Sequence, residues 1–322
     1  MDLKGISRAV ILHNPVGEGD DPSTSDVLAQ VDLVVAGLEA LEITHQALAV
    51  PDWKPWLVLS PEPGTVVFNL MEAPPGVPHV HPAAAAALEL LSLPFTGSQA
   101  GALWLTTDKL ATRALLAAEG FPVAPGGRLD PEILDRLPGP WILKPACEDA
   151  SLGLEGDPVC STREEALARA KALQERFPGQ NVLVETYLTG RELNVSMLAG
   201  EILPVAEIVF EDFPVGMSRV VGYEAKWQED SFAYVHTARR FPEDPADAGL
   251  LERVRKIAEA AWRVCGLRGY ARIDFRLDED GNPYVLEVNA NPCLAADAGF
   301  MAAAAKAGLA PRDVIRRILE DA

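Results

Sequence analysis

Residues 272–292 constrain the fold of this chain more than any other stretch. They read Arg-Ile-Asp-Phe-Arg-Leu-Asp-Glu-Asp-Gly-Asn-Pro-Tyr-Val-Leu-Glu-Val-Asn-Ala-Asn-Pro. Apolar and polar residues alternate on both sides of the Asp-Gly pair, which predicts a β-hairpin. Because side chains repeat on one face of a strand every second residue, a two-residue loop at this pair places Asp274 directly opposite Glu287.

This opposed pair of acids favours a cation site. Two carboxylates that face each other in a sheet repel and destabilise it. The same register pairs Arg272 with Asn289, which adds an amide oxygen beside the acids. Carboxylate and amide oxygens suit Mg²⁺, so the hairpin predicts a magnesium site. The alternative is a half-solvated hairpin whose charges face water.

Composition excludes several classes of protein. The chain has 322 residues and a formal net charge of −19, with no basic stripe, so we expect no nucleic-acid-binding surface. No apolar run is long enough to cross a bilayer, and none follows the first residues, so we expect neither a membrane span nor a signal peptide. The four cysteines lack C-x-x-C spacing, which favours reduced thiols in a cytoplasmic protein.

Strands alternate with helices in the first third of the chain. This order predicts a small parallel α/β unit over residues 1–98. Its glycines do not form G-x-G-x-x-G, so we expect no dinucleotide site there. His79 and His81 lie in a Pro-rich loop without a third ligand nearby, which argues against a metal site. The expected elements are strands at 9–12 and 66–70, a helix capped by Ser25 or Asp26 that ends near Leu41, and a helix at 83–91.

The rest of the chain mixes helices with antiparallel strands. Ser161 and Glu164 form a capping-box pattern that opens a helix ending near Arg176. Residues 192–210 read as a hairpin that turns at 199–200. The other expected elements are helices at 107–120, 250–264 and 311–319, strands at 141–145 and 181–185, and a loop or strand start at 222–226.

Three lysines, a polar loop and the acidic hairpin together predict a polyphosphate site. Lys109 lies in the first turn of its helix, against the helix dipole, and Lys144 lies in a buried strand where it needs an anionic partner. Lys226 follows later, and residues 148–156 form a glycine-bearing loop that could close over phosphates. Such lysines neutralise phosphate oxygens while acids hold the bridging Mg²⁺. The P-loop and protein-kinase motifs are absent.

Residues 95–319 resemble the ATP-grasp superfamily, and within it the D-alanine–D-alanine ligase group. The matching motifs follow the family order over about two thirds of the chain. They are 95–98 (Phe-Thr-Gly-Ser), 107–109 (Thr-Asp-Lys), 120–125 (Gly-Phe-Pro-Val-Ala-Pro), 142–145 (Ile-Leu-Lys-Pro), 151–153 (Ser-Leu-Gly), 182–185 (Val-Leu-Val-Glu) with Glu192, 223–226 (Tyr-Glu-Ala-Lys), 271–274 (Ala-Arg-Ile-Asp) and 286–292 (Leu-Glu-Val-Asn-Ala-Asn-Pro).

The resemblance implies an ATP-grasp fold of mixed α/β and α+β class, in which two α+β subdomains enclose the nucleotide. The implied domains are a small N-terminal α/β domain at 1–98, a central subdomain with a phosphate lid at 99–188, and a C-terminal subdomain with the Mg²⁺ site at 189–322. ATP is the implied cosubstrate, with one or two Mg²⁺ and with Mn²⁺ as a substitute. The implied partners are small-molecule carboxylates and amines, and a homodimer is expected from the resemblance alone.

The resemblance also implies roles for individual residues. Lys109 and Lys144 would contact the α- and β-phosphates, and Lys226 the γ-phosphate. Glu185 would bind the adenine amino group and Glu192 the ribose hydroxyls. The implied nucleotide-binding set is Lys109, Lys144, Ser151, Glu185, Leu188, Glu192, Lys226 and Leu286. The implied metal ligands are Asp274, Glu287 and Asn289, and the implied catalytic residues are Arg272, Lys226, Glu148 and Ser151.

The implied reaction begins when a substrate carboxylate attacks the γ-phosphate of ATP, which gives an acyl phosphate and ADP. An amine then displaces phosphate through a tetrahedral intermediate. Arg272 would stabilise charge on both the phosphoryl group and the oxyanion. Residues 148–153 would form a lid that excludes water and protects the acyl phosphate.

The substrate positions depart from the family pattern. Residues 71–76 replace the family's His-Gly-rich segment. In the lid, Ala150 replaces the first of the family's two serines, and Trp227 replaces the tyrosine that follows Glu-Ala-Lys. After the last Asn-Pro, Cys293 replaces a glycine, and Ala298 replaces the serine that helps to bind the carboxylate of the second substrate. Because sites that pair polar groups reject ligands that lack them, we expect a carboxylate–amine ligase with altered pockets. The chemistry needs no thiol, so Cys293 is not expected to act as a nucleophile.

Two alternatives stay open. One is an authentic D-alanine–D-alanine ligase that has drifted in sequence. The other is a non-catalytic ATP-binding sensor or partner protein, against which the complete arginine and metal-ligand set argues.

Overall fold

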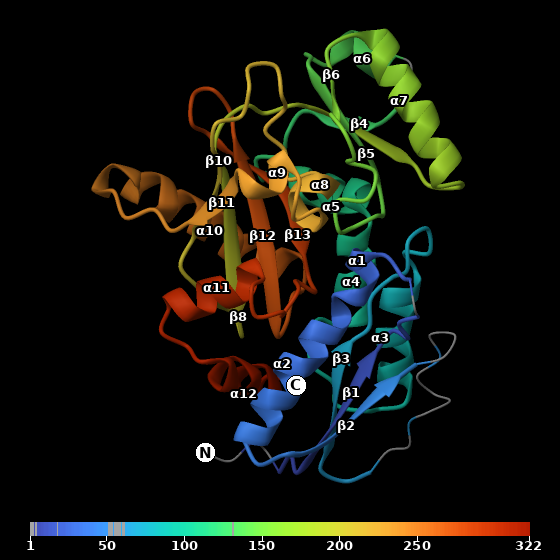
Figure 1. Cartoon of the computed structure of the whole chain (residues 1–322), viewed down its shortest axis with the longest axis vertical. Helices are drawn as coiled ribbons and strands as arrows, with labels where there is room; N and C mark the ends of the chain where they lie inside the picture. The colour runs from blue at the N-terminus through green and yellow to red at the C-terminus, as the bar shows by residue number, and fades with distance from the viewer. Residues whose placement is uncertain are drawn as a thin grey trace.

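Three β-sheets covered by helices organise the chain (Figure 1). The computed structural model describes residues 3, 5–17, 19–50, 54, 59, 62–130 and 132–322. One sheet is three-stranded and parallel, whereas the four-stranded and six-stranded sheets are antiparallel. This combination confirms the mixed α/β and α+β class expected from the sequence.

The parallel sheet has the strand order β2-β1-β3. Its strands are β1 (Arg8–His13), β2 (Thr44–Ala49) and β3 (Thr65–Leu70), and its helices are α1 (Pro22–Ser25), α2 (Val27–Ala40) and α3 (Val80–Leu90). The elements expected at β1, β3, α2 and α3 are confirmed. Strand β2 was not predicted, because none of its residues is buried and its sequence lacks an apolar run.

The four-stranded sheet has the order β4-β7-β5-β6. Its strands are β4 (Gly126–Arg128), β5 (Trp141–Pro145), β6 (Val159–Cys160) and β7 (Val182–Thr186). Helix α7 (Arg163–Arg176) packs on it, and α6 (Ile133–Arg136) joins the same apolar cluster. The preceding helices are α4 (Ala100–Thr107), which packs on α3 and β13, and α5 (Lys109–Ala118). The capping box of α7 lies one residue later than expected. Thr162 Oγ1 accepts from the Glu165 N–H, and Glu165 Oε2 accepts from the Thr162 N–H.

The six-stranded sheet has the order β11-β10-β8-β12-β13, with β9 paired to β8. Its strands are β8 (Glu192–Leu198), β9 (Glu201–Ile202), β10 (Ala206–Phe210), β11 (Thr237–Arg240), β12 (Tyr270–Leu277) and β13 (Pro283–Asn289). Its other elements are α8 (Tyr223–Trp227), α9 (Phe232–Val235), a 3₁₀ turn η3 (Pro245–Asp247), α10 (Ala248–Val264), α11 (Gly299–Lys306) and α12 (Pro311–Glu320). The hairpin expected to turn at Ala199 and Gly200 is confirmed, and both residues have positive φ.

Two helix starts differ from expectation. Residues 222–226 do not begin a strand, because Tyr223 to Trp227 form the short helix α8. The helix expected at 107–120 begins two residues later, as α5 from Lys109, and the helix α4 that ends at Thr107 was not predicted. The Asp108 side chain accepts hydrogen bonds from the N–H groups of residues 110 and 111, which caps α5 and breaks the helical run.

The β12–β13 hairpin confirms the expected register but not the expected turn. Asp274 pairs with Glu287 and Arg272 with Asn289, as predicted. Residue 278 faces residue 282, so the loop holds three residues rather than two. Asp278 favours this longer loop because its side chain accepts from the N–H groups of residues 280 and 282. A bulge after Asp274 then shifts the strands by one residue and restores the predicted pairing.

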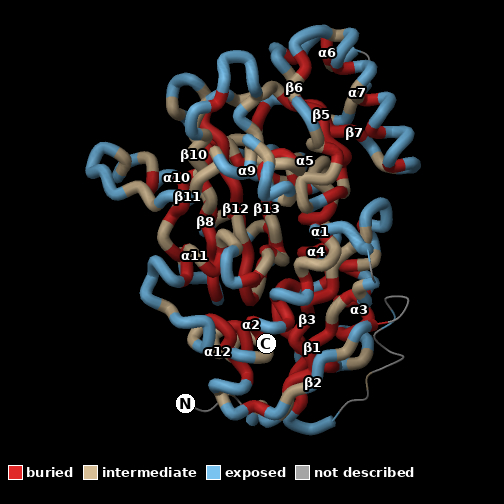
Figure 2. The backbone as a smooth tube through the Cα atoms, viewed as in Figure 1, coloured by how far each residue is buried: buried red, intermediate tan, exposed pale blue. Residues whose placement is uncertain are grey.

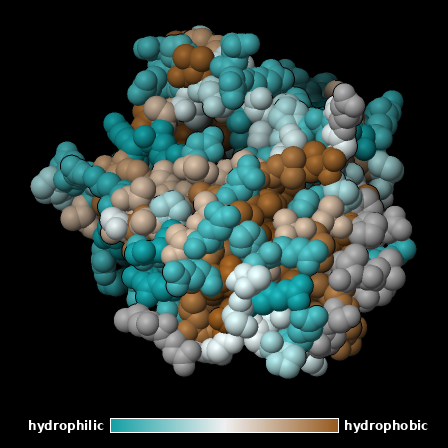
Figure 3. Space-filling model, turned by 60° about the horizontal axis from the view of Figure 1, so that its bottom comes forward, coloured by the Kyte–Doolittle hydropathy of each residue, from teal (hydrophilic) through white to brown (hydrophobic). Residues whose placement is uncertain are grey.

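The N-terminal sheet and the C-terminal helix share a core. Helix α12 packs on α2, and buried residues of both helices join β1 and β3 in one apolar cluster. Gly37 allows the close approach, because a Cβ there would lie 2.6 Å from Ile315 Cγ1. Figure 2 places the buried residues inside these layers. On the face drawn in Figure 3, hydrophilic side chains border an area of hydrophobic ones across the middle.

Candidate functional site

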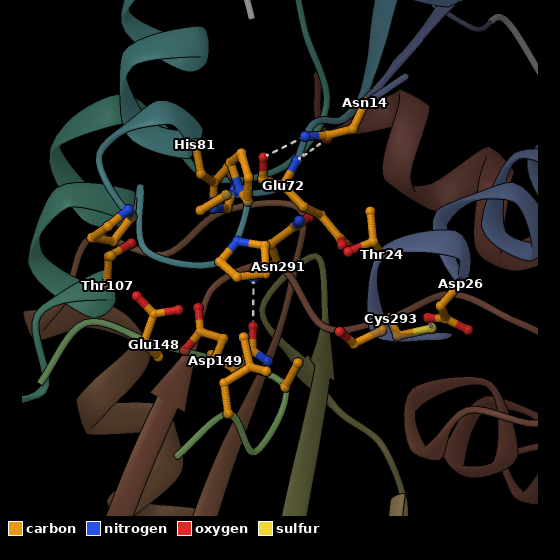
Figure 4. A pocket seen from close by; sticks show the side chains of 18 of the residues that line it. Asn14, Thr24, Asp26, Glu72, His81, Thr107, Glu148, Asp149, Asn291 and Cys293 are labelled. Atoms are coloured by element: carbon orange, nitrogen blue, oxygen red, sulfur yellow. Dashed lines mark hydrogen bonds between the residues drawn. The ribbon is translucent and has the colours of Figure 1, made fainter. Parts of the chain in front are cut away.

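Two adjoining cavities lie where the three sheets meet. The larger has a volume of about 360 Å³ and lies between the ends of β1 and β3, the loop after β5, and the end of β13 (Figure 4). The smaller has a volume of about 20 Å³ and lies between α5, β7 and β13. Thr106 and Val288 line both cavities.

Arg272 and Asp274 form a two-point ion pair on β12. The Nε and Nη2 atoms of Arg272 each donate to an oxygen of Asp274 at 2.7 Å. Asn194 on the neighbouring strand β8 donates to Asp274 Oδ1 at 2.8 Å. Burial would lower the pKa of Arg272, but the Asp274 carboxylate raises it. The guanidinium is therefore charged and held in one orientation.

Lys109 links the acidic hairpin to the loop after β5. Its Nζ lies 3.0 Å from Glu287 Oε1 and 3.1 Å from Asp149 Oδ1, and it donates to the Glu148 carbonyl at 2.6 Å. Burial alone would raise the pKa of Glu287, but Lys109, Lys144 and Arg272 lower it to about 2. Glu287 is thus ionised, and its charge is balanced by the protein's own cations.

A buried ion pair joins β5 to β7. Lys144 Nζ lies 2.8 Å from Glu185 Oε2, and both residues are buried. Arg113 Nε lies 3.5 Å from the other oxygen of Glu185. Lys144 thus has the anionic partner that the sequence required. Glu185 and Leu286 line the smaller cavity together with Lys109 and Glu287.

Glu192 and Leu188 are held together by one arginine. Arg276 Nη1 donates to Glu192 Oε2 at 2.7 Å, and Arg276 Nε donates to the Leu188 carbonyl at 3.0 Å. Burial raises the pKa of Glu192, and the Arg276 charge opposes this rise.

The loop at 148–153 contributes four residues to the lining of the larger cavity and is fixed at several points. The Glu148 carboxylate accepts from the Gly76 N–H and from Gln180, which ties this lid to the N-terminal unit. Trp227 Nε1 donates to the Ala150 carbonyl at 2.9 Å, and Ser151 Oγ donates to the Val221 carbonyl at 2.8 Å. Ala150 and Ser151 both have positive φ, a conformation that such residues hold only when surrounding contacts enforce it.

The N-terminal unit supplies residues that were missed in the sequence. Asn14 and Glu72 follow the expected strands 9–12 and 66–70, and both line the larger cavity. The carboxyl ends of neighbouring parallel strands meet at one edge, which is where such sheets bind ligands. That rule could have found both residues, whereas the position of Gln30 beside Glu72 depends on helix packing.

Cys293 also lies at this cavity, where its thiol donates to Asp26 Oδ2 at 2.9 Å. Burial raises the pKa of the thiol, so at neutral pH it is a protonated donor and not a nucleophile.

The structure places part of the predicted set around the two cavities, whereas the other predicted residues line neither of them: Lys144, Ser151, Leu188, Glu192, Arg272 and Asp274. Lys109, Glu185, Leu286 and Glu287 line the smaller cavity, and Glu148, Lys226 and Asn289 line the larger. Among the described residues, no three His, Cys, Asp or Glu side chains cluster in a way that could hold a metal. The predicted metal ligands are two acids and one amide, so they do not form a cluster of that kind. The amide oxygen of Asn289 accepts a hydrogen bond from the Asn291 N–H at 2.8 Å. No helix within the described ranges is long and apolar enough to cross a membrane.

Comparison with known proteins identifies relatives of this chain. The family described as D-ala D-ala ligase C-terminus matches residues 128–320. Uncharacterized protein y4sG of Sinorhizobium fredii is 31% identical over 303 residues, which covers 90% of this chain and 86% of that protein. The D-alanine–D-alanine ligase of Bordetella avium is 33% identical over 247 residues, which covers 73% of this chain and 72% of that protein.

Solved structures share the whole fold. A crystal structure of a D-alanine–D-alanine ligase from Bacillus anthracis has a TM-score of 0.78 at 21% identity and covers 98% of this chain and 97% of its own. The Bacillus anthracis ligase complexed with ATP has a TM-score of 0.76 at 20% identity, with the same coverage. This likeness confirms the ATP-grasp fold. On the family match and the sequence identity, this chain belongs to the D-alanine–D-alanine ligase family of ATP-grasp proteins.

Proposed function

We propose that this chain is an ATP- and Mg²⁺-dependent carboxylate–amine ligase that acts through an acyl phosphate. One observation carries the proposal. Two partly buried cations, Lys109 and Arg272, pair with the opposed hairpin acids near a cavity of about 360 Å³ that the loop after β5 helps to line. Membership of the ligase family supports it. The proposed domains are 1–98, 99–188 and 189–322.

ATP is proposed to bind between the four-stranded and six-stranded sheets, with its base toward the smaller cavity. Glu185 and Leu286 line that cavity, and Lys144 lies against Glu185. At about 20 Å³ the cavity must widen when a base enters. The ATP complex of the Bacillus anthracis ligase, which has the same fold, supports this nucleotide. Lys109 is then proposed to leave Glu287 and Asp149, and Lys226 to leave the Trp227 ring, so that both ammonium groups contact phosphate oxygens.

The donor set fits Mg²⁺. Asp274 and Glu287 face each other in the register and offer hard oxygen ligands, with Asn289 one pair further along. Their charges are now balanced by Arg272 and Lys109, and a polyphosphate would compete for both cations. Mg²⁺ held by these residues would neutralise charge on the phosphates of ATP.

The proposed reaction has two steps. A carboxylate oxygen of the first substrate attacks the γ-phosphorus, the bond to the β–γ bridging oxygen breaks, and ADP leaves. An amine nitrogen then attacks the acyl carbon, loses a proton, and phosphate departs with the carbon–oxygen bond electrons. Arg272 is held on one edge by Asp274, and no hydrogen bond of its Nη1 is formed within the described part of the chain. It is therefore oriented to donate to the oxyanion.

The lid is proposed to protect the acyl phosphate from water. Four of its residues line the larger cavity, and the contacts of Glu148, Ala150 and Ser151 hold the loop in place. A water-excluded site also strengthens the electrostatic interactions inside it.

An authentic D-alanine–D-alanine ligase is the second candidate, because curated relatives at 33% identity carry that name. The test is to incubate the protein with ATP, Mg²⁺, hydroxylamine and single amino acids, including both enantiomers of alanine. A ligase releases ADP and forms a hydroxamate from at least one carboxylate. Activity with D-alanine alone would favour the second candidate. No ADP from any carboxylate would refute both and leave an ATP-binding sensor.

A further inference from the structure

The wall of the larger cavity is strongly acidic. Among the described residues, Lys226 is the one lysine or arginine that lines it. The acids that line it are Asp20, Asp26, Glu72, Glu148 and Asp149. Both acids of the lid already have partners. Glu148 accepts hydrogen bonds from Gly76 and Gln180, and Asp149 forms an ion pair with Lys109. The acids on the N-terminal wall have no such cation.

Glu72 is held in place by its backbone and by one side-chain oxygen. Asn14 Oδ1 accepts from the Glu72 N–H at 2.7 Å, and Asn14 Nδ2 donates to the Glu72 carbonyl at 2.8 Å (Figure 4). Gln30 Nε2 donates to Glu72 Oε1 at 3.0 Å, while Gln30 Oε1 accepts from the Leu294 N–H. Within the described part of the chain, Glu72 Oε2 forms no hydrogen bond. That oxygen is available to a ligand.

Glu72 and Asp26 lie on one side of the cavity and repel each other. In Figure 4 both lie across the cavity from Glu148 and Asp149. Burial raises the pKa of Glu72 to about 7, and the Asp26 charge adds to the rise, while Gln30 and Lys226 oppose it. A positively charged group between the two carboxylates would remove this repulsion.

His81 gives a second, independent indication of a ligand. It lines the same cavity, its exposed fraction is 8%, and its ring forms no hydrogen bond among the described residues. Burial lowers its pKa to about 4, so at neutral pH the ring is uncharged and offers an acceptor nitrogen. Buried polar groups normally have partners, so an unpartnered ring facing a cavity indicates a ligand that donates a hydrogen bond.

We propose that the wall formed by Glu72, Asp26 and His81 binds the second ammonium group of a diamino carboxylate, so that the substrate resembles ornithine or lysine. The proposal rests on the ligase function proposed above. An ordinary amino acid brings one ammonium group for one carboxylate. This wall has two carboxylates that form no ion pair among the described residues, together with an uncharged acceptor, and it therefore fits one further ammonium group.

The test measures binding separately from turnover. Isothermal titration of the full-length protein with ADP and Mg²⁺ gives Kd for D- and L-ornithine and for D- and L-norvaline, which has no side-chain amine. We expect one enantiomer of ornithine to bind at least about tenfold more tightly than norvaline, as expected for a charge-assisted contact. Glu72→Gln should reduce this ratio to near one, and Asp26→Asn should reduce it in part.

Glu39→Gln is the matched control, because Glu39 is exposed on α2 and does not line the cavity. It should leave the ratio unchanged, and all variants should keep the Kd of ADP. Equal binding of ornithine and norvaline, or an unchanged ratio in Glu72→Gln, would overturn the proposal. ADP release measured with the same amino acids tests the ligase function by itself, so a protein that prefers ornithine but turns nothing over would contradict only the proposed function.

Discussion

Glu287→Gln tests how the ligand-free site holds its charges. In the wild-type protein the Glu287 carboxylate lies 3.0 Å from Lys109 Nζ, and the exposed fraction of its side chain is 26%. Lys109, Lys144 and Arg272 outweigh the effect of burial and lower the pKa of Glu287 from 4.5 to about 2. By linkage, this shift corresponds to roughly 3 kcal/mol of folded-state stability.

The sign of the pH dependence follows from the lowered pKa. A carboxylate whose pKa is lower in the folded state contributes its full stabilisation above the unfolded-state value, and this contribution is lost as the pH falls toward about 2. We therefore expect Glu287→Gln to be destabilised by about 2–3 kcal/mol at pH 7, and by less than half of that near pH 3.

Urea denaturation of both proteins from pH 7 to pH 3 measures this difference. Glu279→Gln in the exposed loop of the same hairpin is the control, and it should change the free energy of unfolding by no more than about 0.5 kcal/mol. A Glu287→Gln effect that stays constant or grows on acidification would refute the pairing with Lys109.

Three other substitutions test the buried pair, the lid and the shared core. Lys144→Met should destabilise the protein by about 3–5 kcal/mol and abolish ATP binding, because it leaves Glu185 buried without its closest cation; urea denaturation and titration with ATP measure both effects. Trp227→Phe removes one hydrogen bond to the lid backbone, so ATP hydrolysis without product should rise relative to ligation, as measured by the ADP-to-product ratio. Gly37→Ala should cost about 1–3 kcal/mol in a urea titration, because its Cβ meets Ile315.

The sequence predicted the hairpin register for a reason that was only partly correct. The alternation of residues identified both strands, and Asp274 does face Glu287. The predicted two-residue loop was wrong, because the Asp278 side chain stabilises a three-residue loop. The bulge after Asp274 compensated for this error. Bulges depend on packing between neighbouring strands, so residue alternation within one strand does not reveal them.

The capping motif did not identify the first residue of α7 correctly, because two neighbouring residues can each cap this helix. Ser161 and Thr162 can each cap the helix that follows, and the structure uses Thr162 because Glu165 can reach back to it. Helix α8 was missed because it is only five residues long. Short helices depend on tertiary contacts more than on sequence.

The two cavities differ in how far the sequence could predict them. The cations and acids around the smaller cavity belong to motifs within single strands and helices, so their types and spacing were informative. The wall of the larger cavity combines Asp26, which precedes α2, Glu72 after β3 and Cys293 after β13, and Gln30 of α2 contacts Glu72 from behind. These residues are far apart in the sequence, and only the packing of the N-terminal sheet against the hairpin brings them together.

Transfer of a carboxylate oxygen to phosphate tests the central claim most directly. The substrate carboxylate is labelled with oxygen-18, the reaction is run with ATP, Mg²⁺ and an amine, and the released phosphate is analysed by mass spectrometry. An acyl phosphate forms through a bond between the carboxylate oxygen and the γ-phosphorus, so the account predicts one labelled oxygen in each phosphate released with product. Product formed together with unlabelled phosphate would contradict it.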